Sequence, residues 1–125
     1  MILYDHYLEV PKEAWWWDDF TPFELRCRGT GAVMVVSHAL NSLQMMREIV
    51  GRPMFINSAY RSPLYNARIG GAPMSRHKFG DAFDISLMDH DKEELHAAAV
   101  QAGFQGFGLN YKTFIHIDKG GIRTW

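Results

Sequence analysis

The sequence has little of what several common protein classes require. It holds one cysteine, Cys27, among 125 residues, so it can form no intrachain disulfide bond and no zinc site made of several thiolates. We predict that Cys27 is a small core residue. The N-terminus lacks a basic segment followed by an apolar stretch, and the longest apolar run, residues 32–36, is too short to cross a bilayer. We therefore expect synthesis in the cytoplasm without a signal peptide, and no membrane insertion.

The chain also lacks an excess of charge of one sign. The 13 basic and 14 acidic residues give a net charge of −1, and no block of like charge occurs. Since binding to phosphate groups requires a basic face, we expect no nucleic-acid partner. No repeat or linker divides the chain, and its length suffices for one core without disulfide bonds. We predict a single domain over residues 1–125, and nothing in the sequence indicates an oligomer.

Hydrophobic spacing and turn residues predict the secondary structure. Residues 1–31, interrupted by prolines and glycines, are expected to be mostly irregular and to pack on the domain. Apolar positions at helical spacing predict a helix over residues 36–50, and Asp91 with Glu94 predicts the start of a helix that ends before Gly103. A short helix is expected over 62–68, and strands over 54–60, 82–87, 104–109 and 114–118. This order favours an α+β fold whose mainly antiparallel sheet has helices packed on one side.

Two histidines and one aspartate are the candidate metal ligands. Because side chains alternate along a strand, Asp84 and His116 fall on the polar faces of their predicted strands. Two adjacent strands could hold a metal ion between these residues, and His77 would reach it from the loop before Gly80. Three protein ligands with one open position are typical of catalytic zinc, which predicts a metallohydrolase. A buried histidine paired with a carboxylate would give the same local pattern without a metal.

Four motifs extend this pattern along the chain. They are Ser58-Ala59-Tyr60-Arg61-Ser62, Gly70-Gly71, Ser75-x-His77-x-x-Gly80-x-Ala82-x-Asp84 and His116-x-Asp118. Together they resemble the zinc D-alanyl-D-alanine carboxypeptidase family, whose relatives include phage endolysin endopeptidases, vancomycin-resistance dipeptidases and the zinc domain of hedgehog proteins. The resemblance covers the chain from about residue 20 to its end and is greatest to the short single-domain enzymes of phages and prophages.

The resemblance implies both a fold and an activity. The fold would be that of hedgehog and D-Ala-D-Ala peptidases, with one zinc ion per chain held by His77, Asp84 and His116. The activity would be hydrolysis of peptide bonds in bacterial peptidoglycan stem peptides, as a carboxypeptidase or an endolysin-like endopeptidase. Such a protein would act on the cell wall after phage-type release or as a virion component.

The resemblance also assigns residues to the substrate. Arg61 corresponds to the family's arginine that faces the oxygen gaining charge or the terminal carboxylate of the substrate. Ser75 resembles the serine that hydrogen-bonds substrate, and Tyr60 is expected to bind substrate as well. The family's general base stands three positions before its last zinc histidine, where this chain has Thr113. Asp118 is either the substitute base or a residue that orients that histidine, and both roles stay open.

The same residues are compatible with functions besides peptide hydrolysis. Because Thr113 cannot act as a general base at neutral pH, the domain could instead be a non-catalytic zinc-stabilised binding module. A zinc phosphoesterase is disfavoured, since the chain offers too few ligands for a two-metal site. The three tryptophans at residues 15–17 could line a substrate groove, although aromatic clusters near a terminus more often pack onto the core.

Overall fold

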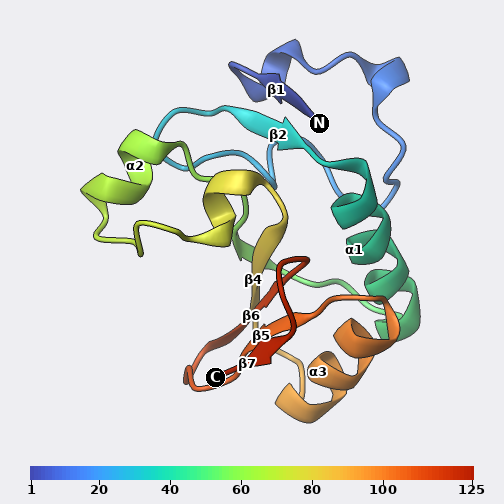
Figure 1. Ribbon diagram of the computed structural model, residues 1–125. Helices are drawn as coiled ribbons and strands as arrows, with labels where there is room; N and C mark the ends of the chain where they lie inside the picture. The colour runs from blue at the N-terminus through green and yellow to red at the C-terminus, as the bar shows by residue number, and fades with distance from the viewer.

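The computed structural model describes residues 1–125 and is shown in Figure 1. Its helices are α1 (Ser37–Val50), α2 (Pro63–Arg68) and α3 (Lys92–Gln101), with short 3₁₀ helices η1 (Tyr7–Glu9), η2 (Lys12–Ala14) and η3 (Arg76–Phe79). Its strands are β1 (Ile2–Tyr4), β2 (Val33–Val35), β3 (Ile56–Ser58), β4 (Ala82–Ser86), β5 (Gly106–Gly108), β6 (Phe114–Asp118) and β7 (Arg123–Thr124). These elements confirm the expected α+β class. No helix has both the length and the apolar character needed to span a membrane.

Five strands form the main sheet, in the order β3-β4-β6-β5-β7. Neighbouring strands are antiparallel except β5 and β7, which run parallel, so the predicted mainly antiparallel sheet is confirmed. The central pair, β4 and β6, sets Asp84 opposite His116 and Ala82 opposite Asp118. Direct cross-strand partners have Cβ atoms about 5 Å apart on the same face. This register therefore gathers the polar residues of both strands on one face of the sheet.

The other face of β4 and β6 carries the hydrophobic core. Phe83 and Ile85 of β4 and Ile115 and Ile117 of β6 are each at most 2% exposed. Buried apolar residues of α1 and α3 belong to the same core, and these helices contact each other beside the sheet (Figure 1). The expectation of helices on one side holds for these two long helices. The short helix α2 lies away from α1 and α3, on the other side of the molecule in Figure 1.

The helix ends follow the signals in the sequence. Gly51 ends α1 in the left-handed conformation, with a φ of 77°, which a residue with a Cβ adopts only at a cost. The Asp91 carboxylate accepts the backbone N–H of Glu94 at 3.1 Å and starts α3. The Ser62 hydroxyl accepts the N–H of Tyr65 at 3.1 Å, and a proline follows Ser62 at the first position of α2.

Three of the short strands, β1, β2 and β7, are not predicted from the sequence. Within residues 1–31, which are expected to be mostly irregular, the structure has the short strand β1, which pairs with β2 so that Ile2 faces Val35 and Tyr4 faces Val33. Such short strands show little of the alternation on which a strand prediction rests, and the equally short β3 and β5 are predicted only as parts of the longer segments 54–60 and 104–109. Burial of Val33 and Val35 fixes β2, and β2 then provides an edge to which β1 can bond.

The three consecutive tryptophans do not share one environment. Trp17 is 4% exposed and donates its indole N–H to Asn41 Oδ1 at 2.8 Å, while Trp15 packs against the same core. Trp16 is 75% exposed. None of the three lines the cleft described below, so Trp15 and Trp17 pack onto the core instead of forming a groove.

Candidate metal centre

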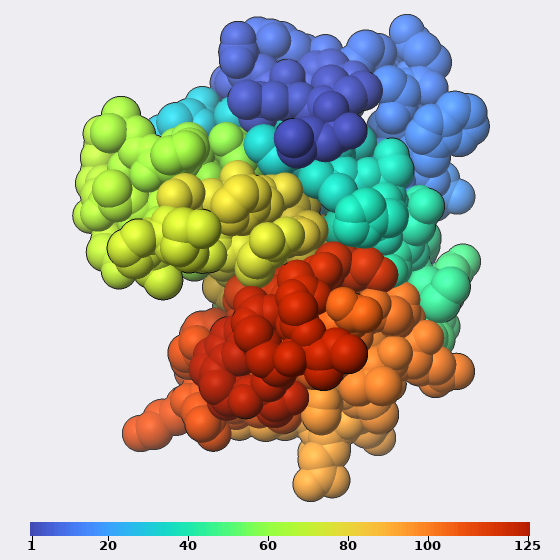
Figure 2. Space-filling view, in the orientation of Figure 1, coloured from blue at the N-terminus to red at the C-terminus, as the bar shows by residue number.

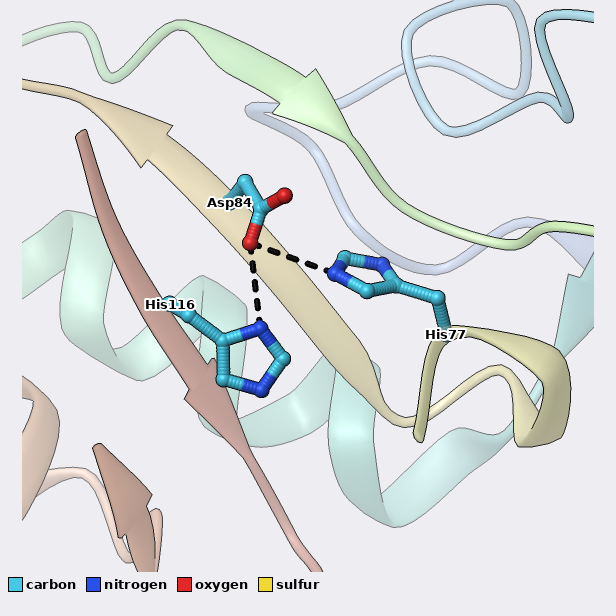
Figure 3. A group of neighbouring side chains, drawn as sticks. All are labelled: His77, Asp84 and His116. Atoms are coloured by element: carbon cyan, nitrogen blue, oxygen red, sulfur yellow. Dashed lines mark hydrogen bonds and ion pairs between the residues drawn. The ribbon is translucent and has the colours of Figure 1, made fainter. Parts of the chain in front are cut away.

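Three segments bring His77, Asp84 and His116 together on the polar face of the sheet (Figure 3). Asp84 and His116 are direct cross-strand partners on β4 and β6. His77 comes from η3, which ends at Gly80 with a φ of 75°. A Cβ at Gly80 would lie 2.8 Å from the Met34 side chain, so glycine permits both the turn and the close packing that place His77. The convergence predicted from the sequence is therefore confirmed.

The three side chains offer one ligand atom each within a small buried volume. Asp84 Oδ1 lies 3.2 Å from His77 Nε2 and 3.1 Å from His116 Nδ1, and all three ligand atoms lie within 4.8 Å of one another. The residues are between 2% and 8% exposed. Two imidazole nitrogens and one carboxylate oxygen match the ligand set that zinc accepts in catalytic sites.

The other ring nitrogens determine which atoms are free for a cation. His77 Nδ1 lies 2.6 Å from the carbonyl oxygen of Ala59, which can only accept, so Nδ1 carries the proton. His116 Nε2 donates to Asp118 Oδ2 at 2.7 Å in the same way. When the rings are neutral, His77 Nε2 and His116 Nδ1 each carry a lone pair that faces the Asp84 carboxylate. Three acceptors that point at one another are stable only if protons or a metal cation lie between them.

The electrostatics of the site favour positive charge at this position. Burial alone would raise the pKa of Asp84, but hydrogen bonds from His116 and His77 outweigh it and lower that pKa to about 2. Burial would lower the pKa of His116, yet its bonds to Asp118 and Asp84 raise it above the usual value. The two carboxylates are therefore charged at neutral pH, and they stabilise a cation in contact with the rings.

Asp118 has no capacity left for a further hydrogen bond. It is fully buried, and its two oxygens accept four bonds, from His116 Nε2, the Gly120 N–H and both terminal nitrogens of Arg123, at 2.7 to 3.0 Å. A carboxylate offers about four lone-pair positions, so all are occupied. Burial would raise the pKa of Asp118, but the bonds from His116 and Arg123 lower it to about 2.

Of the three residues predicted to contact substrate, two line the cleft and one does not. Arg61 lines the cleft, where Nε donates to Ser58 Oγ at 3.1 Å and one terminal nitrogen lies 3.5 Å from Asp84 Oδ2. Ser75 also lines the cleft, and its hydroxyl accepts the His77 N–H at 3.3 Å. Tyr60 does not line the cleft.

The position of Tyr60 does not support the expectation that it binds substrate. It is 6% exposed and packs in a small cluster with Cys27 and Ala32. Neighbouring residues of an extended segment point to opposite sides, so Tyr60 turns inward where Arg61 turns to the cleft. Cys27 is fully buried in the same cluster, which confirms its predicted place in the core.

The metal ligands lie in the wall of a cleft of about 510 Å³. Sequence reasoning missed several residues that line it, namely Ala72, Met74, Arg76, Tyr111, Phe114, Arg123 and Trp125. The rings of Tyr111 and Phe114 stack with centroids 4.3 Å apart. In Figure 2 the yellow surface of the segment around η3 borders the red surface of the last strands, and most of the cleft-lining residues come from these segments. Asp84 is the only carboxylate among the lining residues, and Thr113 is not among them.

The fold and the site together define an α+β domain with a three-ligand metal centre in an open cleft. A family model described as Peptidase M15 matches residues 18–118, so the chain belongs to the peptidase M15 family. The zinc D-Ala-D-Ala carboxypeptidase of Streptomyces albus G is 34% identical to the chain over 88 residues. That match covers 66% of this chain and 34% of the relative, so the chain spans about a third of the length of this curated relative. The family expected from the four motifs is confirmed.

Proposed function

We propose that this chain is a zinc-dependent peptidase that hydrolyses peptide bonds in bacterial peptidoglycan stem peptides. The observation that carries the proposal is the set of three buried ligand atoms of His77, Asp84 and His116, which face one point and match the ligands of a catalytic zinc ion. Membership of a peptidase family supports the hydrolytic activity, and the name of the relative supports both zinc and a D-alanyl substrate. One zinc ion would bind per chain.

Each proposed ligand is held by the fold before any metal binds. His77 Nε2 and His116 Nδ1 are directed inward because Ala59 and Asp118 accept the proton of the other ring nitrogen. Asp84 Oδ1 faces both rings, and its second oxygen lies 3.5 Å from Arg61. Zinc, when bound, supplies a water of lowered pKa and polarises the carbonyl group of a substrate.

Arg61 and Ser75 are the proposed substrate residues of the cleft. Arg61 brings a guanidinium group next to the metal ligands, where it can stabilise the negative charge that develops on the attacked carbonyl or bind a terminal carboxylate. Ser75 can hydrogen-bond the peptide from the neighbouring wall, since its hydroxyl lines the cleft beside His77. The stacked rings of Tyr111 and Phe114 form an apolar wall of the same cleft.

For Asp118 we propose the orienting role rather than that of the general base. A base must have a lone pair that can reach the attacking water. Asp118 is fully buried and already accepts four hydrogen bonds, one of them from the His116 ring. Its carboxylate therefore keeps His116 in the tautomer that presents Nδ1.

A non-catalytic zinc-stabilised binding module is the second candidate. One observation favours it: the cleft offers no carboxylate besides Asp84, and Thr113 lies outside the lining, so no residue stands ready as a general base. Such a module would keep the metal and the cleft and would bind peptide without cutting it. If the chain is catalytic, its metal-bound water must lose a proton without help from a general base, because the metal lowers the pKa of that water.

For the place of action we propose the bacterial cell wall, reached after phage-type release or as part of a virion. The proposal rests on the location of peptidoglycan and on the resemblance of the four motifs to short phage and prophage enzymes.

Digestion of purified peptidoglycan, followed by mass analysis of the fragments, tests the function. We expect zinc-loaded protein to release defined stem-peptide fragments, and the masses identify the bond that is cut. A chelator or the variant His77→Ala should abolish release. His38→Ala is the matched control, because His38 is exposed on α1 and does not line the cleft. Zinc-loaded protein that binds stem peptides and cuts none of them would establish the binding module instead.

A further inference from the structure

Arg123 of β7 contacts Asp118 of β6 although β5 lies between the two strands. The sheet order is β6-β5-β7, yet the terminal nitrogens of Arg123 donate to Asp118 Oδ1 at 3.0 Å and Oδ2 at 2.7 Å. This two-point geometry is the strongest arrangement of an arginine with a carboxylate. Asp118 is fully buried, while the Arg123 side chain is 41% exposed and lines the cleft. The ion pair therefore crosses β5 on the face that carries the metal ligands.

Glycine at position 106 makes this crossing possible. Gly106 is the register partner of Asp118 on one side and of Arg123 on the other, so all three point to the same face. A Cβ at Gly106 would overlap Asp118 Oδ1 and lie 2.6 Å from Arg123. Any other residue at this position would separate the two charged groups. Glycine in the interior of a strand commonly marks such a close approach.

The same arrangement recurs two residues further along β5. Gly108 is the register partner of His116, and a Cβ there would lie 2.9 Å from the rings of both Trp125 and Tyr111. The Trp125 and His116 rings have centroids 5.1 Å apart, and the Trp125 indole N–H donates to the Tyr111 hydroxyl at 3.0 Å. Trp125 thus reaches across Gly108 to lie beside the ligand ring. Both glycines of the Gly106-Phe107-Gly108 strand leave room for a side chain from the far edge of the sheet.

We propose that Arg123 and Trp125 are positioning residues for the metal ligand His116, and that Gly106 and Gly108 allow them to reach it. Arg123 fixes the Asp118 carboxylate so that it accepts the His116 Nε2–H, and Nδ1 is then presented to the metal. Trp125 limits the rotation of the His116 ring from the cleft side. The proposal rests on the metal site of the proposed function, but its geometry exists in the metal-free protein.

Removal of Arg123 leaves a buried carboxylate with two of its four hydrogen bonds. The Asp118 side chain is then free to reorient, and the His116 proton loses a fixed acceptor. Outer partners of a ligating histidine typically contribute roughly 10- to 100-fold to metal affinity. We expect a loss of this size in Arg123→Met and in Gly106→Ala. Arg123→Lys keeps a charge and one donor and should restore part of the affinity.

Two controls are matched to these variants. Gly121→Ala adds the same methyl group at a glycine that has open space around it and no positive φ. Arg52→Met removes an arginine that contacts only Asp89 and Glu94, away from the cleft. Both controls should bind zinc within about twofold of the parent protein, since Arg52 lies outside the contacts that end at His116 and Gly121→Ala keeps the backbone carbonyl that accepts from Arg123 at 2.8 Å.

Zinc affinity by competition with a chromophoric chelator, combined with a double-mutant cycle, is the first test. Arg123→Met should weaken binding in the parent protein but add little further loss in an Asp118→Asn background, because the two residues act through one contact. A merely structural role of Arg123 would instead give the same loss of zinc affinity in both backgrounds. That result would overturn the proposal.

The second test does not involve metal at all. Long-range ¹H–¹⁵N NMR spectra of the metal-free protein report which ring nitrogen of His116 carries the proton. At a pH high enough for the His116 ring to be neutral, we expect the Nε2–H tautomer in the parent protein and a detectable fraction of the other tautomer in Arg123→Met and Gly106→Ala. An unchanged tautomer population in both variants would contradict the proposal. If the parent protein fails to bind zinc, the proposed function fails, and the tautomer comparison still decides the role of Arg123.

Discussion

Asp84 and His116 are direct cross-strand partners on β4 and β6, and Asp84 Oδ1 lies 3.1 Å from His116 Nδ1. Because His116 donates its other ring proton to Asp118, Nδ1 and the Asp84 carboxylate both have lone pairs to offer. Ordinary cross-strand pairs stabilise a sheet by packing or by complementary charge. With a neutral imidazole this pair does neither, and it becomes favourable when a proton or a metal cation lies between the two atoms, which is why we interpret it as part of a metal site.

Replacement of one ligand should remove the metal. The variant His77→Ala leaves two of the three ligand atoms, so we expect a loss of stoichiometric zinc after dialysis and a loss of peptide hydrolysis. Metal content by atomic emission is the measurement, with His38→Ala as the control because that ring is exposed on α1. Retention of one zinc ion per chain in His77→Ala would show that the metal binds elsewhere.

Replacement of Asp118 separates its two possible roles. If Asp118 orients His116, Asp118→Ala should weaken zinc binding by roughly 10- to 100-fold, and excess zinc should restore much of the activity. If Asp118 is the general base, zinc affinity should stay near that of the parent protein while kcat falls by roughly 10²- to 10⁴-fold at saturating metal. Zinc affinity and kcat measured on the same preparation distinguish these outcomes.

Arg61 should affect turnover more than metal binding. Loss of one donor that stabilises developing charge typically costs roughly 10²- to 10³-fold in kcat, which is the fall we expect for Arg61→Met. Arg61 also lies 3.5 Å from Asp84 Oδ2, so zinc affinity has to be determined for the same variant. A parent-like kcat at full zinc occupancy would exclude Arg61 from the reaction.

Added zinc should stabilise the folded chain. A ligand that binds only the native state raises the free energy of unfolding by about 4 kcal/mol at a thousandfold excess over its Kd. We therefore expect the thermal midpoint of chelator-treated protein to rise when zinc is added, and to rise less in Asp84→Asn. Calorimetry at several zinc concentrations is the measurement. A midpoint that does not depend on zinc would contradict binding to the native state.

The metal-free protein should lose stability in strong acid. The pKa values of Asp84 and Asp118 are lowered to about 2 from 3.8, so their contribution is complete above pH 3.8 and is lost as the pH falls toward 2. The raised pKa of His116 acts at the other end, since its contribution is complete below pH 6.5 and is lost at higher pH. Denaturant titrations of metal-free protein across this acid range should show the fall, and Asp118→Asn should show a smaller one.

Most of the metal site can be predicted from short sequence motifs. Strand alternation places Asp84 and His116 on polar faces, and Gly80 together with the loop position of His77 predicts the third ligand. The two long helices can be predicted in the same way, because α1 has apolar residues at helical spacing and α3 begins at a capping aspartate. These features depend on neighbours within a few residues, which is why the sequence alone predicts them.

The remaining features depend on tertiary pairing. β7 has two residues and no pattern of its own, and its side chains reach the site only because it pairs with β5. The two possible roles of Asp118 differ only in which groups occupy its oxygens, and one of these groups, Arg123, comes from β7. The inward position of Tyr60 likewise follows from packing with Cys27, which is distant in the sequence. The alternate glycines of β5 are the sequence signal that could have indicated a close approach there.

X-ray absorption spectroscopy at the zinc edge reports directly whether His77, Asp84 and His116 hold the ion. We predict one zinc ion per chain with two imidazole nitrogens and a carboxylate oxygen as protein ligands, at roughly 2.0 to 2.2 Å. The variant His116→Ala, like His77→Ala, leaves two of the three ligand atoms and should lose its stoichiometric zinc. A parent chain that takes up no stoichiometric zinc, or a His116→Ala protein that keeps one zinc ion with two histidine ligands, would contradict this ligand set.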